Sequence, residues 1–230
     1  MASSTLSDRE NGGKRTRGAA SVGPVRYQKM REPRIGRLVI AALHQAIAEA
    51  LPLRLEFYEN WLKPLGLLKE GKHIGPAPFS AALSFLRRED VGLYEAITGR
   101  AGVLAADWRA DFLRWSGRRW ARWLPEWWRS RSALRAMRRI SRAAYPNTRV
   151  RCRVRTGAAR VEITRSAFCQ VREPVDRPLC AFYAGVVRRL MAAYGLAATV
   201  QLERCLATGG EVCVLSVTWQ PGDTFGETAG

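Results

Sequence analysis

The spacing of apolar and polar residues divides this chain of 230 residues into a helical first half and a second half with strand periodicity. Apolar residues recur near a period of about 3.6 in the first half, which predicts amphipathic helices. These helices are expected over residues 35–62, 79–87 and 90–97, the last one resuming through Trp108. Pro52 is expected to break or kink the first helix, because proline lacks the backbone donor that a helix needs. Asp90 is expected to cap the third helix, and Gly99 and Gly102 are expected to interrupt it.

A further helix, basic and amphipathic, is predicted after Pro125. Leu134, Met137 and Ile140 form its apolar stripe, and arginines lie opposite that stripe. Five of these arginines are candidates for binding an anionic surface: Arg131, Arg135, Arg138, Arg139 and Arg142. The surrounding segment, residues 108–155, holds 15 arginines against two acidic residues, and six of the eight tryptophans.

After Pro146 the period changes to two, which is typical of strands. Val150, Cys152 and Val154 alternate with arginines, and Gly157 marks a turn into a second strand, so a β-hairpin is predicted over 149–164. A helix at about 179–194 and strands at 199–205 and 211–219 are predicted to follow. The fold class is therefore α/β of the α+β type, with an N-terminal helical half followed by a small antiparallel sheet and a crossing helix.

Four regions are expected along the chain. They are a disordered basic tail over 1–33, a helical region rich in Arg and Trp over 34–145, an α/β domain over 146–220 and a frayed tail over 221–230. The sequence has no apolar run long enough to span a bilayer, and the basic N-terminus is not followed by the apolar segment of a secretory signal. We therefore expect a cytoplasmic protein, with docking on the inner face of the membrane as an open alternative.

The formal net charge of +18 predicts an anionic partner, because so much like charge repels itself. The Arg and Trp residues of segment 108–155 suit anionic lipid at a membrane surface or an acidic protein. Nucleic acid is less favoured, because no helix-turn-helix or zinc-finger spacing accompanies the charge. The alternative left open is that the tryptophans form the core and the arginines cover it.

The sequence gives little support for an enzyme. Its two histidines, His44 and His73, have no neighbouring arrangement of Ser, Cys or Asp that indicates a nucleophile and its base. Residues 71–75 lack the Gly-Lys-Ser/Thr of a phosphate loop.

The cysteines suggest a metal site. If the last hairpin turns at Gly209, Cys205 faces Cys213, and Glu203 lies on the same face of the sheet. Cys180 opens the preceding helix and can reach the same point. Three thiolates and one carboxylate suit Zn²⁺. Two other interpretations stay open, namely that these cysteines are ordinary core residues or that Cys205 and Cys213 form a disulfide.

Residues 149–219, most clearly from Val161 to Trp219, resemble the 4-vinyl reductase domain family, which is similar in fold to TRAPP vesicle-tethering subunits and to haem-NO-binding-associated domains. The motifs that carry the resemblance are Phe168-Cys169, Cys180-Ala181-Phe182-Tyr183-Ala184-Gly185, Glu203-Arg204-Cys205 and Gly209-Gly210-Glu211-Val212-Cys213. The family includes the sensor part of phenol-responsive bacterial activators and proteins of bacteriochlorophyll synthesis, and its members commonly form dimers.

In the sensor members of this family, three cysteines and one glutamate hold a zinc ion. The resemblance places these roles on Cys180, Cys205, Cys213 and Glu203. The Glu-to-Cys spacing varies within the family, so Glu211 is an alternative to Glu203. The loop that carries Cys169 can also fold back and supply the fourth ligand.

Three functions are compatible with these patterns. The first is a non-catalytic module or scaffold that binds a small apolar molecule or lipid, carries a structural zinc and forms a homodimer. The second is a membrane-surface or assembly adaptor whose basic helix binds anionic lipid or an acidic protein. The third, by family analogy alone, is an enzyme or carrier of tetrapyrrole biosynthesis.

Overall fold

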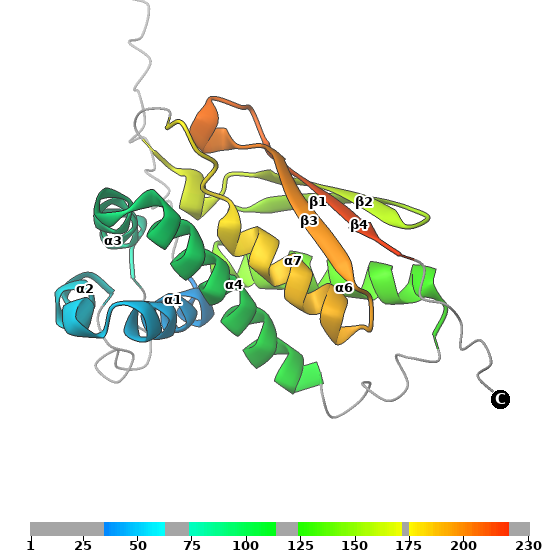
Figure 1. Cartoon of the computed structure of the whole chain (residues 1–230), viewed down its shortest axis with the longest axis horizontal. Coiled ribbons are helices and arrows are strands. Elements are labelled where there is room, and N and C mark those ends of the chain that lie inside the picture. Colours follow the sequence, from blue (N-terminus) through cyan, green and yellow to red (C-terminus); the bar gives the residue numbers. More distant parts are fainter. Residues whose placement is uncertain (1–34, 63–73, 114–123, 172–174, 221–230) are drawn as a thin grey trace, which may run out of the picture. The chain divides into compact units, whose positions relative to one another are not determined.

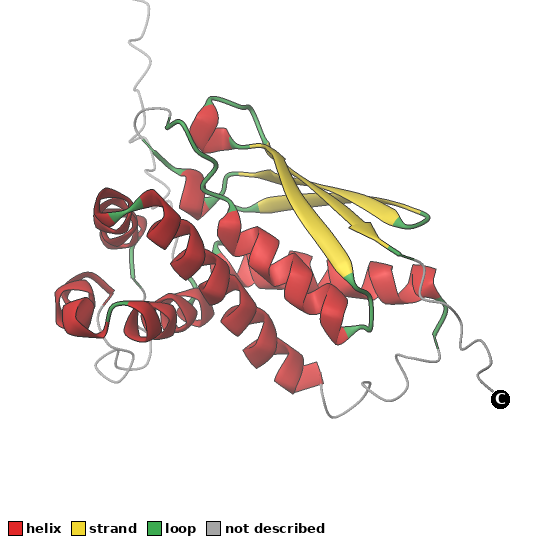
Figure 2. Ribbon diagram, in the orientation of Figure 1, coloured by secondary structure: helices red, strands yellow, loops and turns green. Residues whose placement is uncertain are grey.

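The computed structural model describes residues 35–62, 74–113, 124–171 and 175–220. The two predicted tails lie outside these residues. The described chain has the predicted mixed α and β class, with helices and one four-stranded antiparallel sheet (Figure 2). Helices α6 (Glu126–Ala144) and α7 (Ala181–Ala193) pack against the sheet, and α4 (Val91–Leu113) packs on α7 (Figure 1).

The predicted break at Pro52 and the predicted cap at Asp90 are both present among the N-terminal helices. Helix α1 (Arg37–Ala50) ends before Pro52, which opens a short 3₁₀ helix, η1 (Pro52–Arg54), and the chain then turns into α2 (Leu55–Leu62). Helix α3 (Pro76–Glu89) starts at a proline, where a missing backbone donor costs little. The predicted cap of α4 is confirmed, because the Asp90 carboxylate accepts a hydrogen bond from the Leu93 backbone N–H at 2.8 Å.

Membrane-spanning potential among the described helices is confined to one bent pair. No single described helix has both the length and the apolar composition that a bilayer span requires. The segments Arg37–Ala50 and Pro52–Leu62 meet the criterion together, but a bend of 120° separates them. Buried residues of both segments belong to the protein core, which gives their apolar composition a structural explanation.

The prediction that Gly99 and Gly102 interrupt the third helix is wrong, because α4 runs through both positions without a break. Glycine weakens a helix by roughly 1 kcal/mol relative to alanine, so these positions need another explanation. A Cβ atom on Gly102 would lie 2.1 Å from the Phe182 carbonyl oxygen of α7. A Cβ atom on Gly185 of α7 would lie 2.2 Å from the Gly99 carbonyl oxygen. Gly102 and Gly185 therefore allow the backbones of α4 and α7 to approach to near contact.

The sheet contains the strands that the period of two predicts. Its strands are β1 (Arg149–Arg155), β2 (Ala158–Thr164), β3 (Ala198–Arg204) and β4 (Cys213–Trp219), in the order β1-β2-β4-β3. The turn between β1 and β2 contains Gly157, whose φ of +68° is unfavourable for residues with a side chain. Strand β1 is one edge of the sheet and β3 is the other.

One hydrophobic core joins the helical region expected over 34–145 to the α/β region expected over 146–220. The buried cluster runs from Ile35 of the N-terminal part to Trp219 at the end of β4. The predicted apolar stripe of α6 belongs to it, since Leu134, Met137 and Ile140 are all buried. The apolar face of this basic helix is therefore occupied by the protein's own interior.

Candidate metal centre

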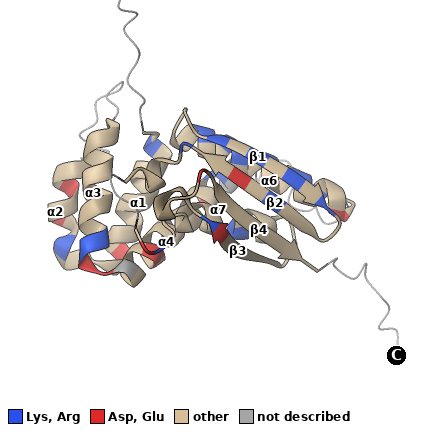
Figure 3. Ribbon diagram, turned by 90° about the horizontal axis from the view of Figure 1, so that it is seen from above, with Lys and Arg blue, Asp and Glu red and all other residues tan. Residues whose placement is uncertain are grey.

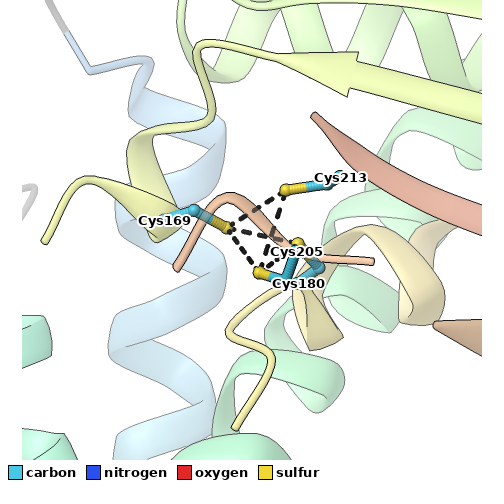
Figure 4. Close-up of side chains that lie close together, drawn as sticks. All are labelled: Cys169, Cys180, Cys205 and Cys213. Atoms are coloured by element: carbon cyan, nitrogen blue, oxygen red, sulfur yellow. Dashed lines mark hydrogen bonds between the residues drawn. The ribbon is translucent and has the colours of Figure 1, made fainter. Parts of the chain in front are cut away.

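Four cysteine side chains converge on one point in the core (Figure 4). All are buried, and their Sγ atoms lie within 4.8 Å of one another. The Sγ–Sγ distances are 3.2 Å for Cys169–Cys180 and Cys180–Cys205, 3.6 Å for Cys169–Cys205 and Cys169–Cys213, and 3.9 Å for Cys205–Cys213. We call Cys169, Cys180, Cys205 and Cys213 the cysteine cluster.

Each member of the cysteine cluster comes from a different structural element. Cys169 ends the short helix η3 (Ala167–Cys169), which follows β2. Cys180 is the N-cap of α7, and Cys213 is the first residue of β4. Cys205 follows β3 and caps the short helix η4 (Leu206–Thr208). The cluster therefore joins the end of one hairpin, the start of a helix and the loop of the next hairpin.

The last hairpin brings Cys205 and Cys213 together as the sequence predicts. The loop between them closes on itself, because the Gly210 N–H donates to the Cys205 carbonyl at 3.0 Å. Gly209 adopts a left-handed conformation with φ +85°. Glycine is suited to this position, because residues with a Cβ atom rarely adopt such angles.

The structure corrects the assignment of Glu203 to the metal site. A register irregularity between Leu202 and Arg204 adds one residue to β3, and such a bulge reverses which side chains face the core. Glu203 is exposed, and its Oε2 accepts a hydrogen bond from Arg160 at 2.8 Å instead. Glu211, the alternative, is also exposed. Cys169 supplies the fourth side chain of the cluster.

The geometry and chemistry of the cluster fit a tetrahedral zinc ion. With Zn–S bonds of about 2.3 Å, the sulfur atoms of a tetrahedral site lie about 3.8 Å apart. The observed distances of 3.2 to 3.9 Å bracket this value. They are far longer than the bond of about 2.05 Å in a disulfide, and all four cysteines are free. Thiolates are also the soft ligands that zinc prefers in structural sites.

Backbone donors point at two of the sulfur atoms. The N–H groups of Leu179 and Ala207 lie 3.3 and 3.4 Å from the Cys205 Sγ. The N–H of Leu206 lies 3.3 Å from the Cys213 Sγ. Such hydrogen bonds stabilise a thiolate and hold it in a fixed direction, as groups around metal ligands commonly do.

The hydrogen bonds within the cluster shift the pKa values of its thiols in opposite directions. Hydrogen bonds from Cys169, Cys180 and Cys213, together with the Leu179 N–H, lower the pKa of Cys205. The pKa of Cys180 is raised by its hydrogen bonds to the other three thiols and by burial. A divalent cation bound at the cluster would stabilise the thiolate form of all four side chains.

Aromatic residues lie next to the cluster in the core. Phe168 directly precedes Cys169, and Phe182 lies two residues after Cys180. Their rings stack with centroids 4.4 Å apart. The Tyr94 hydroxyl donates to the Phe168 carbonyl at 3.5 Å, and burial raises the pKa of Tyr94 well above its usual range. A closed site with four protein ligands leaves no position for a substrate, which is typical of structural zinc.

The predicted anionic-surface residues lie away from the cluster, on α6. Arg131, Arg135, Arg139 and Arg142 are exposed, and Arg138 is half-buried. The Arg138 Nε donates to the Val150 carbonyl of β1 at 3.0 Å. Figure 3 shows basic residues along α6 and β1.

Of the two histidines, His44 is the one that the structure describes, and it takes no part in the cysteine cluster. The His44 Nε2 lies 2.8 Å from the Glu59 carboxylate, between α1 and α2. His73 lies outside the described residues.

Comparison with known proteins shows a fold and no family. No family model matches the chain, and no curated protein matches it. An H-NOX protein from Shewanella oneidensis in the Fe(II)NO state is similar with a TM-score of 0.53 and 9% identity, over 80% of this chain and 98% of that one. An Fe(II) unliganded H-NOX protein from K. algicida is similar with a TM-score of 0.50 and 11% identity, over 84% and 100% of the two chains.

A lower similarity is found to the phenol-responsive sensory domain of the transcription activator PoxR, with a TM-score of 0.47 and 14% identity over 64% of this chain and 77% of that one. The two H-NOX comparisons show that the chain has the α+β fold of these H-NOX proteins. Membership of the 4-vinyl reductase family stays a prediction.

Proposed function

We propose that this chain is a non-catalytic small-molecule-binding module whose fold is held together by a structural Zn²⁺ at the cysteine cluster. The observation that carries the proposal is the convergence of four buried Sγ atoms within 4.8 Å. The N–H groups that point at Cys205 and Cys213 support it independently, because they favour thiolates over thiols. Zinc bound in this way contributes directly to folding free energy.

The likeness to H-NOX proteins supports the ligand-binding part of the proposal through the fold alone. The H-NOX protein from Shewanella oneidensis is in an Fe(II)NO ligation state. Haem iron is not part of the proposal, because the described histidine His44 is paired with Glu59. A tetrahedral set of four thiolates suits zinc or a sulfur-ligated iron centre, and the proposal commits to zinc, which the metal analysis below tests.

The residues of the cluster would act as a clasp between segments that are distant in sequence. Bound zinc would supply four strong ligand bonds to Cys169, Cys180, Cys205 and Cys213. Cys180 would fix the start of α7 relative to the η3 segment, and Cys205 and Cys213 would fix the loop of the last hairpin. Pairing of two copies, which the family resemblance implies, remains a prediction that light scattering can test.

Metal analysis of the purified protein tests the zinc proposal. We expect elemental analysis and native mass spectrometry to find one zinc ion per chain in protein prepared without chelators. A Cys152→Ser variant is the matched control, because Cys152 is a free cysteine outside the cluster and should leave the zinc content unchanged. Protein that folds with no stoichiometric metal, or with iron in place of zinc, contradicts the proposal.

The adaptor hypothesis keeps support from the surface of α6. The stripe of Leu134, Met137 and Ile140 is buried in the core and is not available to a bilayer, but Trp127 and Trp128 at the start of the helix are exposed and suit the headgroup region of a membrane. The exposed arginines of α6 still offer a charged surface to an anionic partner. Salt-dependent binding that leaves the fold intact would support this second candidate function.

A further inference from the structure

The free edge of β1 carries backbone groups that point away from the sheet. Arg138 Nε donates to the Val150 carbonyl, so this carbonyl is directed away from β2. In an antiparallel pair, alternate residues direct both backbone groups to the same side, and Cys152 and Val154 share the parity of Val150. Within the described part of the chain, these edge groups of Cys152 and Val154 have no hydrogen-bond partner. They form a short template for another strand.

Arginines flank this edge on both sides. On the outer face of the sheet, β1 exposes four arginines that have no carboxylate partner among the described residues: Arg149, Arg151, Arg153 and Arg155. Glu162 lies opposite Arg151 in the register, but its carboxylate pairs with Arg160 at 3.5 Å. The outer side of the edge therefore has an excess of unpaired positive charge.

On the inner side, a groove of about 240 Å³ runs between α6 and β1. Three arginines of α6 line it, together with Leu134 and the inward side chains of β1. The residues that line it are Arg131, Leu134, Arg135, Arg138, Cys152 and Val154. The groove thus combines positive charge with apolar surface directly beside the free backbone groups of β1.

We propose that the edge of β1 binds an extended acidic peptide segment, which adds to the sheet as a further strand. Side chains alternate between the two faces of a strand, so successive residues of the segment would lie towards Arg151 and Arg153 and then into the groove. Acidic side chains would complement the arginines, and apolar stems would cover the half-buried Cys152 and Val154. The proposal is independent of the metal, because Cys152 lies outside the cysteine cluster.

Other occupants fit these observations less well. A second copy pairing through β1 would set four arginines beside four, and like charges directly opposite are destabilising. A membrane would meet the exposed Trp127 and Trp128 at the start of α6, but it would leave the edge N–H and C=O groups of Cys152 and Val154 without partners. A nucleic acid would satisfy the charge but would leave the edge N–H and C=O groups of Cys152 and Val154 without the strand partner that they match.

The test uses the full-length protein and a blocked synthetic peptide of alternating Glu and Val residues. We expect salt-sensitive binding in a calorimetric titration. We also expect amide hydrogen exchange at Cys152 and Val154 to slow by about tenfold or more, because their N–H groups gain partners. The Arg151 and Arg153 amides should change little, since residues of that parity already bond to β2. The same peptide with N-methylated backbone positions should bind at least about tenfold more weakly.

Charge variants separate this edge from general attraction to a basic protein. The double substitution Arg151→Glu and Arg153→Glu should weaken peptide binding by about tenfold or more. The double substitution Arg88→Glu and Arg188→Glu changes two exposed arginines elsewhere by the same charge and should have a much smaller effect. Equal binding of the N-methylated peptide, or unchanged exchange at Cys152 and Val154, overturns the proposal. Binding to phosphatidylserine vesicles or to a single-stranded oligonucleotide without binding to the peptide also overturns it.

Discussion

The Sγ atoms of Cys205 and Cys213 lie 3.9 Å apart, across a loop that their own hairpin closes. Half of the candidate metal site is therefore formed by local structure. The other half comes from Cys169 and Cys180, which belong to separate elements and reach the site only when the fold is assembled. Metal binding at this point would thus be coupled to tertiary folding.

The fourth ligand can be identified by comparing two substitutions. Cys169→Ser should lower the zinc content and the melting temperature, because it removes one of four converging thiols. A loss of about 3 kcal/mol corresponds to a fall in Tm of roughly 6–12 °C for a chain of this size. Glu203→Gln should retain zinc, since Glu203 contacts Arg160 on the outer face. Elemental analysis and differential scanning calorimetry measure both variants. Loss of zinc in Glu203→Gln would show that Glu203, and not Cys169, is the fourth ligand.

Removal of zinc by a chelator should loosen the backbone around the cluster before the rest of the protein. A thiol accepts a hydrogen bond more weakly than a thiolate, so amide exchange should accelerate at Leu179, Leu206 and Ala207. Amides in the middle of the sheet, such as those of Val161 and Val217, should remain protected and serve as internal controls. Unchanged exchange at the three donors would mean that the metal does not organise them.

The glycines of α4 provide a matched pair for testing the helix contact. Gly102→Ala should lower stability by about 1–3 kcal/mol, because the new Cβ atom would collide with the Phe182 carbonyl of α7. Gly99→Ala should leave stability unchanged or raise it by up to about 1 kcal/mol, since its Cβ atom would have ordinary contacts of 3.9 Å and alanine favours a helix. Urea denaturation measures both. A loss of stability in Gly99→Ala equal to that in Gly102→Ala would contradict this account of the contact.

The parts of the structure that the sequence predicts are those governed by local periodicity. The alternation in residues 149–164 identifies β1 and β2, and Pro52 and Asp90 act through local backbone chemistry. The role of Gly102 could not be predicted in this way, because it depends on the Phe182 carbonyl, which belongs to a helix distant in sequence. A glycine inside a helix has the same local cost whether it breaks the helix or permits a close contact.

The ligand set shows the same division between local and distant information. Cys205 and Cys213 follow from counting residues across one turn. The exposed position of Glu203 does not follow from such counting. The extra residue between Leu202 and Arg204 places Glu203 and Cys205 on opposite faces of the strand, and the alternation of apolar and polar residues does not locate this bulge. Cys169 lies in a segment without periodicity. Its only signal in the sequence is that it is a cysteine in a loop that can fold back towards the three other thiols.

Cys152 allows a pH-dependent test of the environment on the inner face of β1. Burial raises the pKa of Cys152 to about 11, and the guanidinium of Arg138 only partly opposes this effect. An unperturbed cysteine has a pKa of about 8.5, and the thiolate is the form that reacts with alkylating reagents. Because the pKa is raised, the neutral thiol persists through the range in which an exposed thiol ionises. The iodoacetamide reaction of Cys152 should therefore still rise about tenfold per pH unit between roughly pH 9 and 10.

The same shift has a consequence for stability. The folded state retains the Cys152 proton above the pH at which the unfolded chain releases it, so this contribution to stability is present below about pH 8.5 and is lost as the pH rises towards 11. A Cys152→Ala variant lacks the titrating group, and the difference between its unfolding free energy and that of the wild type should shift in the variant's favour over this range. Intact-mass analysis of alkylated protein and urea denaturation at several pH values provide the two measurements. A labelling rate that levels off near pH 9 would show that the Cys152 thiol is not shielded by α6.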